Sequence, residues 1–497
     1  MSEPSGDYGL GDLAVQLIDG ELRAATGGGT FATINPANEE TLGVAADGTA
    51  ADMDAAIAAA RRAFDDDVEG WTTDPALRAR CLRQLHDAFA SRRDDLRALT
   101  RDEVGAPIFM LDAAQFDMPV ADVNFFADLA ERYDGWRVDL GEATPMGMPT
   151  HRWMLREPAG VVGAITPWNF PHQLNLAKLG PALAAGCTVV LKAAPDTPWC
   201  ASALARLIAE ATDIPAGVVN IVNSSDHSLG AQLAGDPRVD VVSFTGSTAT
   251  GRKVMASASA NLTKVFLEMG GKSAFVVLDD ADLTGAASVA AATVCAHAGQ
   301  GCAITTRLLL PRDRFDEGVE AAAATLTAIG CGDLDDPATM CGPLISARQR
   351  DRVEGYLRLA TEEGGTFAAG GGRPADRDKG FWIEPTLVVG VDNSARVARE
   401  EIFGPVLVAM PHDGDDDAVR IANDSPYGLS GSIASADSTR AWAVAKRIRT
   451  GTLGINGGIW YSGDVPFGGY KQSGIGREMG VAGFEEYLET KSIAEGI

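Results

Sequence analysis

The sequence is poor in positive charge. It has 42 Lys and Arg residues against 68 Asp and Glu, which gives a formal net charge of −26 and an isoelectric point near 4.6. Nucleic-acid backbones and anionic lipid surfaces are bound by clustered Lys and Arg. We therefore expect neither a nucleic acid nor a membrane among the partners. The acidity indicates a well-solvated surface, and tolerance of high salt is a second interpretation.

Long apolar runs, a secretion signal and paired cysteines are also missing. No run approaches the ~18 apolar residues of a membrane span, and Met1 to Ser5 lack the basic and apolar regions of a signal peptide. The cysteines are Cys81, Cys187, Cys200, Cys295, Cys302, Cys331 and Cys341. This odd set contains no CxxC pair, which indicates free thiols in a reducing compartment. We expect a cytoplasmic protein.

Signatures of metal and dinucleotide binding are absent as well. The six histidines show no HxxxH or HExxH spacing, so we expect no metal site. His297 lies close to Cys295 and Cys302, either as half of a Cys/His pair or as a wall residue, and we favour the wall. No GxGxxG segment follows a strand-like run, so the usual dinucleotide fingerprint is missing.

The chain is too long for one compact core, since single cores rarely exceed roughly 250 to 300 residues. Its hydrophobic fraction of 46% and charged fraction of 22% are those of a globular protein. Apolar positions at helical spacing predict packing helices over about residues 51–99. Two large domains are expected.

From residue 158 onward, short apolar runs alternate with helical stretches. The strand-like runs are 161–165, 188–191, 218–222 and 241–244, and the helical stretches are 174–185, 199–211 and 250–260. This alternation predicts a mostly parallel sheet covered by helices, which binds ligands beyond the carboxyl ends of its strands. A second α/β series begins near Gly270 with the run 273–278. Residues 149–157 and 490–497 look extended and are candidate oligomer contacts.

Three segments place reactive side chains in unusual surroundings. In Gly299-Gln300-Gly301-Cys302, small residues would let a substrate reach a nucleophilic sulfur, although a buried structural cysteine is the plainer alternative. Glu268 ends an apolar run before two glycines, as a desolvated general base or as a carboxylate that caps a helix or turn. Asn169 lies in a turn between two prolines, as an oxyanion donor or an ordinary turn residue.

A fourth segment is a weaker signal. Residues 243–248, followed by Gly251, combine a strand, a turn of small residues and the start of a helix. Helix N-termini of this kind accept phosphate groups.

Together these segments resemble the aldehyde dehydrogenase superfamily, over residues 35–491. The motifs that carry the resemblance, in the family's order and spacing, are residues 267–273, 299–302, 400–406 and 466–474. The resemblance implies an α/β fold of two doubly wound parallel-sheet domains, one Rossmann-like for the cofactor and one catalytic, plus a small β oligomerisation arm. The NAD(P)-binding domain would be 1–137 and 159–269, the catalytic domain 270–482, and the arm 138–158 and 483–497.

The resemblance implies oxidation of an aldehyde to a carboxylic acid with NAD(P)+. Cys302 would attack the aldehyde, while the Asn169 side chain and the Cys302 backbone N–H hold the oxyanion of the thiohemiacetal. After hydride transfer to the nicotinamide, Glu268 would activate the water that hydrolyses the thioester. Lys178 and Glu478 match a buried pair proposed to relay protons away from the general base.

The expected cofactor is NAD, with NADP as the alternative. By resemblance, the cofactor positions are Ile165, Thr166, Trp168, Lys192, Asp196, Gly246, Ser247, Gly270, Gln349, Glu401 and Phe403. Lys192 and Glu401 would contact the riboses, Ser247 the pyrophosphate and Phe403 the nicotinamide end. Pro195 departs from the family, because many NAD-preferring members carry there a Glu that binds the adenosine ribose. Asp196 could substitute for it.

The substrate is expected to be a neutral, medium-sized or aromatic aldehyde. By resemblance, the tunnel-lining positions are Phe170, Leu174, Ala177, Ala296, Trp460, Tyr461 and Phe467. Members that use carboxylated semialdehydes tend to carry Arg in this region, and neither Ala177 nor the loop 457–465 offers one. A CoA-acylating enzyme and a catalytically silent structural relative are the alternatives. Family members are usually dimers or tetramers, so a homo-oligomer is expected.

Overall fold

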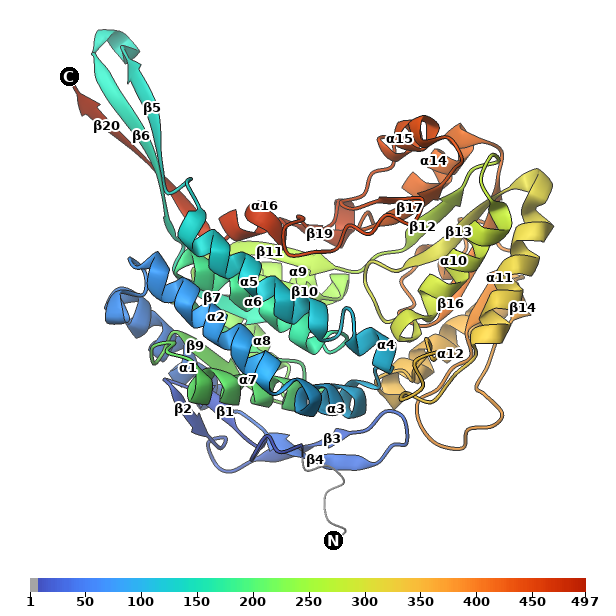
Figure 1. Cartoon of the computed structure of the whole chain (residues 1–497), viewed down its shortest axis with the longest axis horizontal. Coiled ribbons are helices and arrows are strands. Elements are labelled where there is room, and N and C mark those ends of the chain that lie inside the picture. Colours follow the sequence, from blue (N-terminus) through green and yellow to red (C-terminus); the bar gives the residue numbers. More distant parts are fainter. Residues whose placement is uncertain (1–7) are drawn as a thin grey trace.

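Two open α/β sheets form the body of the molecule, and a thin antiparallel β-arm projects from it (Figure 1). The computed structural model describes residues 8–497. Met1 to Ser5, on which the expectation about a signal peptide depends, lie outside the described residues. Within residues 8–497, no helix has both the length and the hydropathy that crossing a membrane requires.

The first sheet has eight strands in the order β19-β11-β10-β7-β8-β9-β1-β2. They are β1 (Gln16–Ile18), β2 (Glu21–Arg23), β7 (Val161–Ile165), β8 (Thr188–Lys192), β9 (Val219–Val222), β10 (Val241–Gly246), β11 (Lys264–Met269) and β19 (Gly474–Ile475). The strands from β11 to β9 pair in parallel, whereas β1, β2 and β19 pair antiparallel at the edges. β19 belongs to this sheet although it comes from residues 270–482, the segment expected to form the second domain.

Each face of the first sheet has its own hydrophobic core. Val162 and Val189 belong to one core, and their neighbours Val161 and Val190 belong to the other. The first core is covered by α2 (Pro75–Ser91), α3 (Arg93–Val104), α4 (Ile108–Leu111), α5 (Asp117–Arg132), α6 (Pro171–Ala185) and α7 (Pro198–Ala211), and the second by α1 (Ala50–Asp65), α8 (Ser228–Gly235) and α9 (Thr248–Ala258). Strands buried on both faces are continuous apolar runs, which is why these strands are recognisable in the sequence.

The second sheet has the order β14-β15-β16-β13-β12-β17-β18 and is parallel except for β14. Its strands are β12 (Ser273–Val277), β13 (Thr305–Pro311), β14 (Thr366–Ala369), β15 (Thr386–Val389), β16 (Val406–His412), β17 (Gly431–Ala434) and β18 (Gly454–Ile455). Its helices are α10 (Leu283–Cys295), α11 (Phe315–Ile329), α12 (Ala347–Glu362), α13 (Arg396–Arg399), α14 (Asp415–Asn423) and α15 (Ser438–Ala445). The two mostly parallel sheets confirm the predicted fold class.

The chain passes from the first sheet to the second at residues 270–272, between the end of β11 and the start of β12. The carboxyl end of β11 therefore lies beside the amino ends of β12 and of its parallel neighbour β13. Open α/β sheets bind ligands beyond the carboxyl ends of their strands. The crossing point thus places a candidate site between the two sheets.

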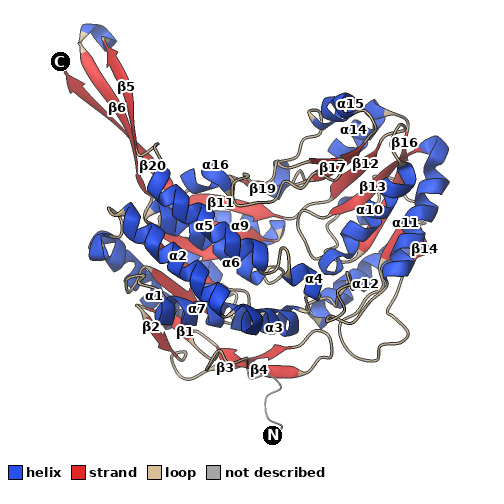
Figure 2. Ribbon diagram, viewed as in Figure 1, coloured by secondary structure: helices blue, strands red, loops and turns tan. Residues whose placement is uncertain are grey.

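The β-arm consists of β5 (Arg137–Ala143), β6 (Thr150–Pro158) and β20 (Leu488–Gly496), in the order β20-β6-β5 (Figure 2). β20 runs antiparallel to β6 from the pair Leu488 and Pro158 to the pair Gly496 and Thr150. Both chain segments that looked extended in the sequence are thus strands of one sheet. β3 (Thr30–Ile34) and β4 (Thr41–Ala46) form a separate two-stranded ribbon, and α16 (Gly480–Glu485) precedes β20.

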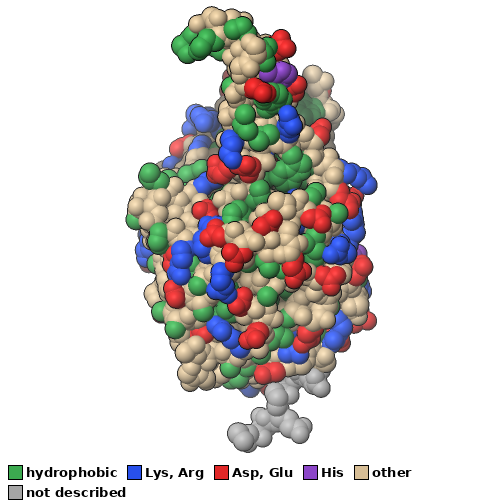
Figure 3. Space-filling view, turned by 90° about the vertical axis from the view of Figure 1, so that its left-hand side faces the viewer, with side chains coloured by type: hydrophobic (Ala, Val, Ile, Leu, Met, Phe, Trp, Pro, Cys, Tyr) green, Lys and Arg blue, Asp and Glu red, His purple; other side chains and the backbone are tan. Residues whose placement is uncertain are grey.

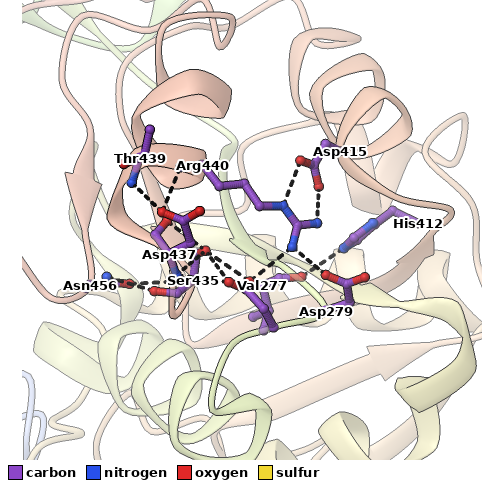
Figure 4. Close-up of polar contacts among 10 residues, drawn as sticks. Val277, Asp279, His412, Asp415, Ser435, Asp437, Thr439, Arg440 and Asn456 are labelled. Carbon is purple, nitrogen blue, oxygen red and sulfur yellow. Dashed lines mark hydrogen bonds and ion pairs between the residues drawn. The ribbon is translucent and has the colours of Figure 1, made fainter.

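Charged side chains cluster beyond the carboxyl ends of β12, β16 and β17, at the end of the second sheet away from the crossing point (Figure 4). Arg440 donates to both oxygens of Asp415, at 2.6 and 2.9 Å, and to Asp279 at 2.6 Å. Asp280 accepts hydrogen bonds from the Ser435 hydroxyl and the Asp437 N–H. We call these residues, Asp279, Asp280, Asp415, Ser435, Asp437 and Arg440, the Arg440 network.

Candidate active site

A cavity of about 460 Å³ opens between the two sheets. The predicted residues that line it are Trp168, Asn169, Phe170, Leu174, Gly246, Ser247, Glu268, Gly270, Cys302, Gln349, Glu401, Phe403, Trp460, Tyr461 and Phe467. They come from the ends of β7, β10 and β11, the helices α6 and α12, the loop before β13, and the loops after β15 and β18. Segments up to about 300 residues apart in the chain thus meet in one cavity.

Other predicted residues lie away from the cavity wall. Ile165 and Lys192 end β7 and β8, and Thr166 and Asp196 follow these strands. Ala177, on α6, borders a smaller adjoining pocket together with Asp122 and Phe126. Ala296 is half-buried in the turn that follows α10.

The cavity also has lining residues that the sequence did not single out: Ala114, Met118, Gln173, Thr293, Ile304 and Arg352. Ala114 comes from the α4–α5 connection and Met118 from the first turn of α5, and neither segment carries a motif. Gln173 is a different case, because it stands three residues after Phe170 at the start of α6, and helical spacing alone could have found it.

Cys302 follows a strained turn. His297, Ala298 and Gly299 adopt successive left-handed conformations, with φ of 49°, 50° and 71°. Each non-glycine residue in this region costs about 1 to 2 kcal/mol, so the surrounding structure must hold the turn in place. Burial raises the pKa of the Cys302 thiol, and the carboxyl groups of Glu268 and Glu401 raise it further. The sulfur is therefore held as a thiol until a base takes its proton.

His297 packs as a wall rather than against the sulfur. Its ring lies 5.0 Å from that of Phe170, centroid to centroid, and the side chain is buried. Burial lowers its pKa to about 4, so the imidazole is neutral at physiological pH. No hydrogen bond joins it to Cys302 among the described residues.

Glu268 lies inside β11 and caps neither a helix nor a turn. The side chain is 2% exposed, and neither carboxyl oxygen has a hydrogen bond of good geometry. Burial raises its pKa well above the ordinary value, the nearby Glu478 carboxylate raises it further, and the Cys302 thiol lowers it. A buried carboxyl group with a raised pKa and unused oxygens can accept a proton near neutral pH.

Asn169 is held from two sides, in the loop between β7 and α6. Its side-chain amide donates to the backbone carbonyl oxygen of Gln300 at 2.8 Å. Its backbone carbonyl oxygen accepts a hydrogen bond from the Gln115 side chain at 2.7 Å. An amide nitrogen carries two N–H groups, so one remains for a ligand in the cavity.

Lys178 and Glu478 form a buried ion pair behind Glu268. Lys178 also donates to the Ser243 hydroxyl at 2.9 Å, and Thr245 donates to Glu478 at 3.2 Å. These contacts make a chain of exchangeable protons from the first sheet to the neighbourhood of the general-base candidate.

The residues expected to hold a cofactor fit a dinucleotide. Ser247 is the exposed N-cap of α9, so that the first turn of this helix offers N–H groups to a phosphate beside the cavity. Lys192 donates only to the carbonyl oxygens of Ala193 and Ser224, and burial lowers its pKa to about 8. An added Cβ at Gly270 would lie 2.2 Å from a Glu401 carboxyl oxygen, so a larger residue there would displace the Glu401 side chain.

The other end of this cradle is aromatic and rigid. Phe403 and Trp168 meet edge to face with ring centroids 5.4 Å apart, and Gln349 donates to the Phe403 carbonyl oxygen at 2.7 Å. Glu401 accepts the Gly271 N–H at 3.1 Å, and burial raises its pKa to about 7.

Comparison with known proteins gives consistent results. Residues 23–493 match the profile of the aldehyde dehydrogenase family. The 3-succinoylsemialdehyde-pyridine dehydrogenase of a Pseudomonas species is 42% identical over 480 residues, 96% of this chain and 97% of the relative. The geranial dehydrogenase of Castellaniella defragrans is 42% identical over 463 residues, 93% and 94% of the two chains.

Solved structures agree with these sequence relatives. Betaine aldehyde dehydrogenase from Staphylococcus aureus, in complex with NAD+, superposes with a TM-score of 0.93 at 35% identity, over 99% of this chain and 97% of that one. An aldehyde dehydrogenase from Mycobacterium tuberculosis, complexed with NAD+, gives a TM-score of 0.92 at 41% identity, over 97% of both chains.

Proposed function

The chain belongs to the aldehyde dehydrogenase family and is an NAD(P)-dependent enzyme of that class, and from this premise we propose that it works through a covalent intermediate on Cys302. The observation that supports this proposal is the meeting of Cys302, Asn169 and Glu268 around one cavity, with both Glu268 oxygens unpaired. The product is the carboxylic acid.

Cys302 is the nucleophile. As its sulfur bonds to the carbonyl carbon, the thiol proton passes to solvent through the open cavity and the carbonyl oxygen takes up negative charge. The free N–H of the Asn169 side chain and the backbone N–H of Cys302 hold this oxygen. When bound, the nicotinamide cofactor supplies the acceptor for the hydride that leaves the same carbon.

Glu268 acts as general base on the thioester that remains on Cys302. It takes a proton from a water molecule, the water oxygen attacks the thioester carbon, and the Cys302 thiolate leaves as the acid is released. Glu478 and Lys178 pass the proton away, along the contacts with Thr245 and Ser243.

We propose NAD+ as the preferred cofactor, held by Ser247 at the pyrophosphate, by Lys192 and Glu401 at the riboses and by Phe403 at the nicotinamide. Two structural relatives are described in complex with NAD+. Asp196, whose carboxylate pairs with Arg348 at 3.4 Å, lies beyond β8 on the same side as Lys192 and would repel a 2′-phosphate.

We propose a neutral, medium-sized or aromatic aldehyde as the substrate. The aromatic wall supports this, because the rings of Trp460 and Phe467 stack with centroids 5.5 Å apart and Tyr461 meets Phe467 edge to face. Among residues 8–497, Arg352 is the one cationic side chain that lines the cavity. It donates to the backbone carbonyl oxygens of Glu401 and Ile402, at the cofactor end. Two relatives are named for geranial and for 3-succinoylsemialdehyde-pyridine.

We propose a homo-oligomer, a dimer or tetramer, built through the β-arm. β20 leaves one edge of its sheet unpaired, and such an edge can accept a strand from another chain. Leu140, Met146, Met148 and Ile493 are exposed apolar side chains on the arm. The space-filling view shows hydrophobic side chains toward the end of the arm (Figure 3). Light scattering after size-exclusion chromatography measures the mass, and a monomer at micromolar concentration would contradict the proposal.

We also propose a cytoplasmic location. All seven cysteines of the chain are free thiols, which supports a reducing compartment.

The direct test of the reaction follows the absorbance of reduced nicotinamide with aliphatic, aromatic and carboxylated aldehydes, using NAD+ and NADP+ in parallel and without CoA. We expect turnover of neutral aldehydes with NAD+, and loss of at least about 10³-fold in Cys302→Ala. Turnover that appears only with added CoA would favour an acylating enzyme, and no turnover with any aldehyde would favour a silent relative. Activity that survives in Cys302→Ala would exclude the proposed nucleophile.

A further inference from the structure

Gln300 connects the strained turn before Cys302 to a loop of the second sheet. Its side-chain oxygen accepts the Ile345 N–H at 2.9 Å, and its side-chain nitrogen donates to the carbonyl oxygens of His297 at 3.1 Å and Pro343 at 3.3 Å. The side chain is fully buried. Each of its donors and its acceptor is therefore engaged, two with the loop and one with the turn itself.

These bonds act on the least relaxed part of the backbone. The turn His297 to Gly299 is left-handed at three successive residues, and such a conformation persists only where the surroundings determine it. Gly299 presses against the carbonyl oxygen of Gly404 on the other side, where an added Cβ would lie 2.1 Å away. Gln300 is the residue whose side chain ties the turn to a neighbouring loop just before Cys302.

The same residue orients the oxyanion donor. The backbone oxygen of Gln300 accepts one N–H of the Asn169 side chain at 2.8 Å, which fixes the direction of the other N–H. Gln115, also fully buried, holds the Asn169 backbone at 2.7 Å. Two glutamines that do not line the described cavity thus hold Asn169 between them.

We propose that Gln300 is a positioning residue, which fixes Cys302 and the Asn169 amide relative to one another by anchoring the turn 297–299 to residues 343–345. Gln115 supports Asn169 from the other side and contributes less, because it does not contact the turn. This inference rests on the proposed function for its catalytic consequence, but the anchoring itself is a property of the free enzyme. Misplacement of reacting groups by about 1 Å can cost about 10²-fold in rate.

The first arm of the test is kinetic and compares four variants of the full-length enzyme. We expect Gln300→Met to lower kcat by about 10- to 100-fold and Gln115→Met by about threefold to tenfold, with the Kd for NAD+ unchanged. Gln16→Met is the control for loss of a buried glutamine, because Gln16 is fully buried on β1, beside the edge strand β2 at the far side of the first sheet, and its side chain has no hydrogen-bond partner among the described residues. It should keep the wild-type kcat.

Gln300→Glu adds a pH readout that a purely structural role would not produce. A buried glutamic acid still donates one hydrogen bond while it is protonated, but its carboxylate only accepts, and it would then face the carbonyl oxygens of His297 and Pro343. We expect the ratio of its kcat to that of wild type to fall about fivefold or more between pH 6 and pH 9. The same ratio for Gln300→Met should stay flat.

The second arm needs no substrate. The rate at which iodoacetamide alkylates Cys302, followed by peptide mass spectrometry, reports how firmly the turn holds this half-buried thiol. Release of the turn should raise this rate about threefold or more in Gln300→Met and leave it unchanged in Gln16→Met. If wild type oxidises no aldehyde, the proposed function fails while this arm still decides the anchoring.

Unchanged kcat and unchanged alkylation in Gln300→Met would overturn the proposal. An equal loss in Gln16→Met would overturn it too, because the effect would then belong to any buried glutamine. If Gln300→Met does not fold, the nearly isosteric Gln300→Glu decides the question: a flat kcat ratio over the pH range contradicts the role of the two donated hydrogen bonds.

Discussion

Charged side chains stand in opposite states at the two ends of the second sheet. The Arg440 network lies beyond the carboxyl ends of its strands, and the cavity, which Glu268 of the first sheet lines, lies at their amino ends. In the Arg440 network, Arg440 meets Asp415 with two hydrogen bonds and Asp279 with a third, and its hydrogen bonds hold the pKa of Asp415 below the ordinary value. At the cavity, neither Glu268 oxygen has a hydrogen bond of good geometry within the described part of the chain, and burial raises its pKa. The Asp415 carboxylate thus has hydrogen-bond partners where solvent is near, whereas the Glu268 carboxyl group lacks them where solvent is excluded.

This difference in hydrogen bonding indicates that the Arg440 network serves stability and that Glu268 serves the reaction. Native structures pair nearly all their buried polar groups, since an unpaired one costs free energy. A carboxyl group that stays unpaired at the meeting point of two sheets keeps its proton affinity for a reactant, and strongly perturbed groups of this kind gather at functional sites. We therefore expect substitutions at the two ends to affect different measurements.

The largest effect is expected for Glu268→Gln. The amide has nearly the same shape but cannot take a proton from water, so kcat should fall by about 10³-fold. A burst of one equivalent of reduced cofactor per active site should remain, because acylation of Cys302 precedes the hydrolysis of the thioester, which is the step that needs Glu268. Pre-steady-state absorbance of the reduced cofactor measures both. A kcat within tenfold of wild type would contradict the assignment of the base.

The same variant should be more stable than wild type at high pH. A carboxyl group whose folded pKa is raised stabilises the protein only while protonated, so its ionisation costs stability as pH rises from the unfolded pKa, about 4.3, through the folded one. Thermal unfolding should thus give Glu268→Gln the higher Tm at pH 8 and an equal Tm at pH 4. A lower Tm at pH 8 would mean that the charged carboxylate has a partner.

The Lys178–Glu478 pair is an intermediate case between the Arg440 network and Glu268. Its charges have partners, as in the Arg440 network, but it lies close to the cavity, as Glu268 does. Lys178→Met leaves the Glu478 carboxylate buried without its partner and should cost about 3 kcal/mol of unfolding free energy. Chemical denaturation measures this. The double variant Lys178→Met with Glu478→Gln should lose less than the sum of the single losses, because the two residues are in contact. Additive losses would show that the ion pair is not coupled.

The sequence predicted the central strands of both sheets better than their edges. The runs 161–165 and 241–244 are strands because strands buried on both faces must be continuously apolar. β19 has two residues and pairs with β11, some 200 residues earlier in the chain, so no local sequence pattern predicts this strand. This long-range pairing is also why a single boundary near residue 270 does not divide the two sheets.

The reactive residues could be recognised in the sequence, whereas the residues that position them could not. Cys302, Glu268 and Asn169 stand beside glycines or prolines, and these local irregularities are legible in the sequence. Gln115 and Met118 lie in and beside ordinary helical sequence, and only the packing of α5 against α6 brings them to the site. The sequence therefore indicated the chemistry, while the groups that position it required the structure.

The smallest effect is expected for Arg440→Met, at the satisfied end. Loss of the guanidinium leaves Asp279, Asp280 and Asp415 without their shared cation, and because these groups are partly exposed, solvent screening limits the cost to about 1 kcal/mol at pH 7. Asp415 has a folded pKa below the unfolded value near 3.9, so its contribution is present above that pH and is lost as pH falls through the folded pKa. The stability difference between variant and wild type should therefore shrink toward the acid end of a denaturation series from pH 7 to pH 3, while kcat stays within twofold. A tenfold loss of kcat would mean that the Arg440 network contributes to catalysis as well as to stability.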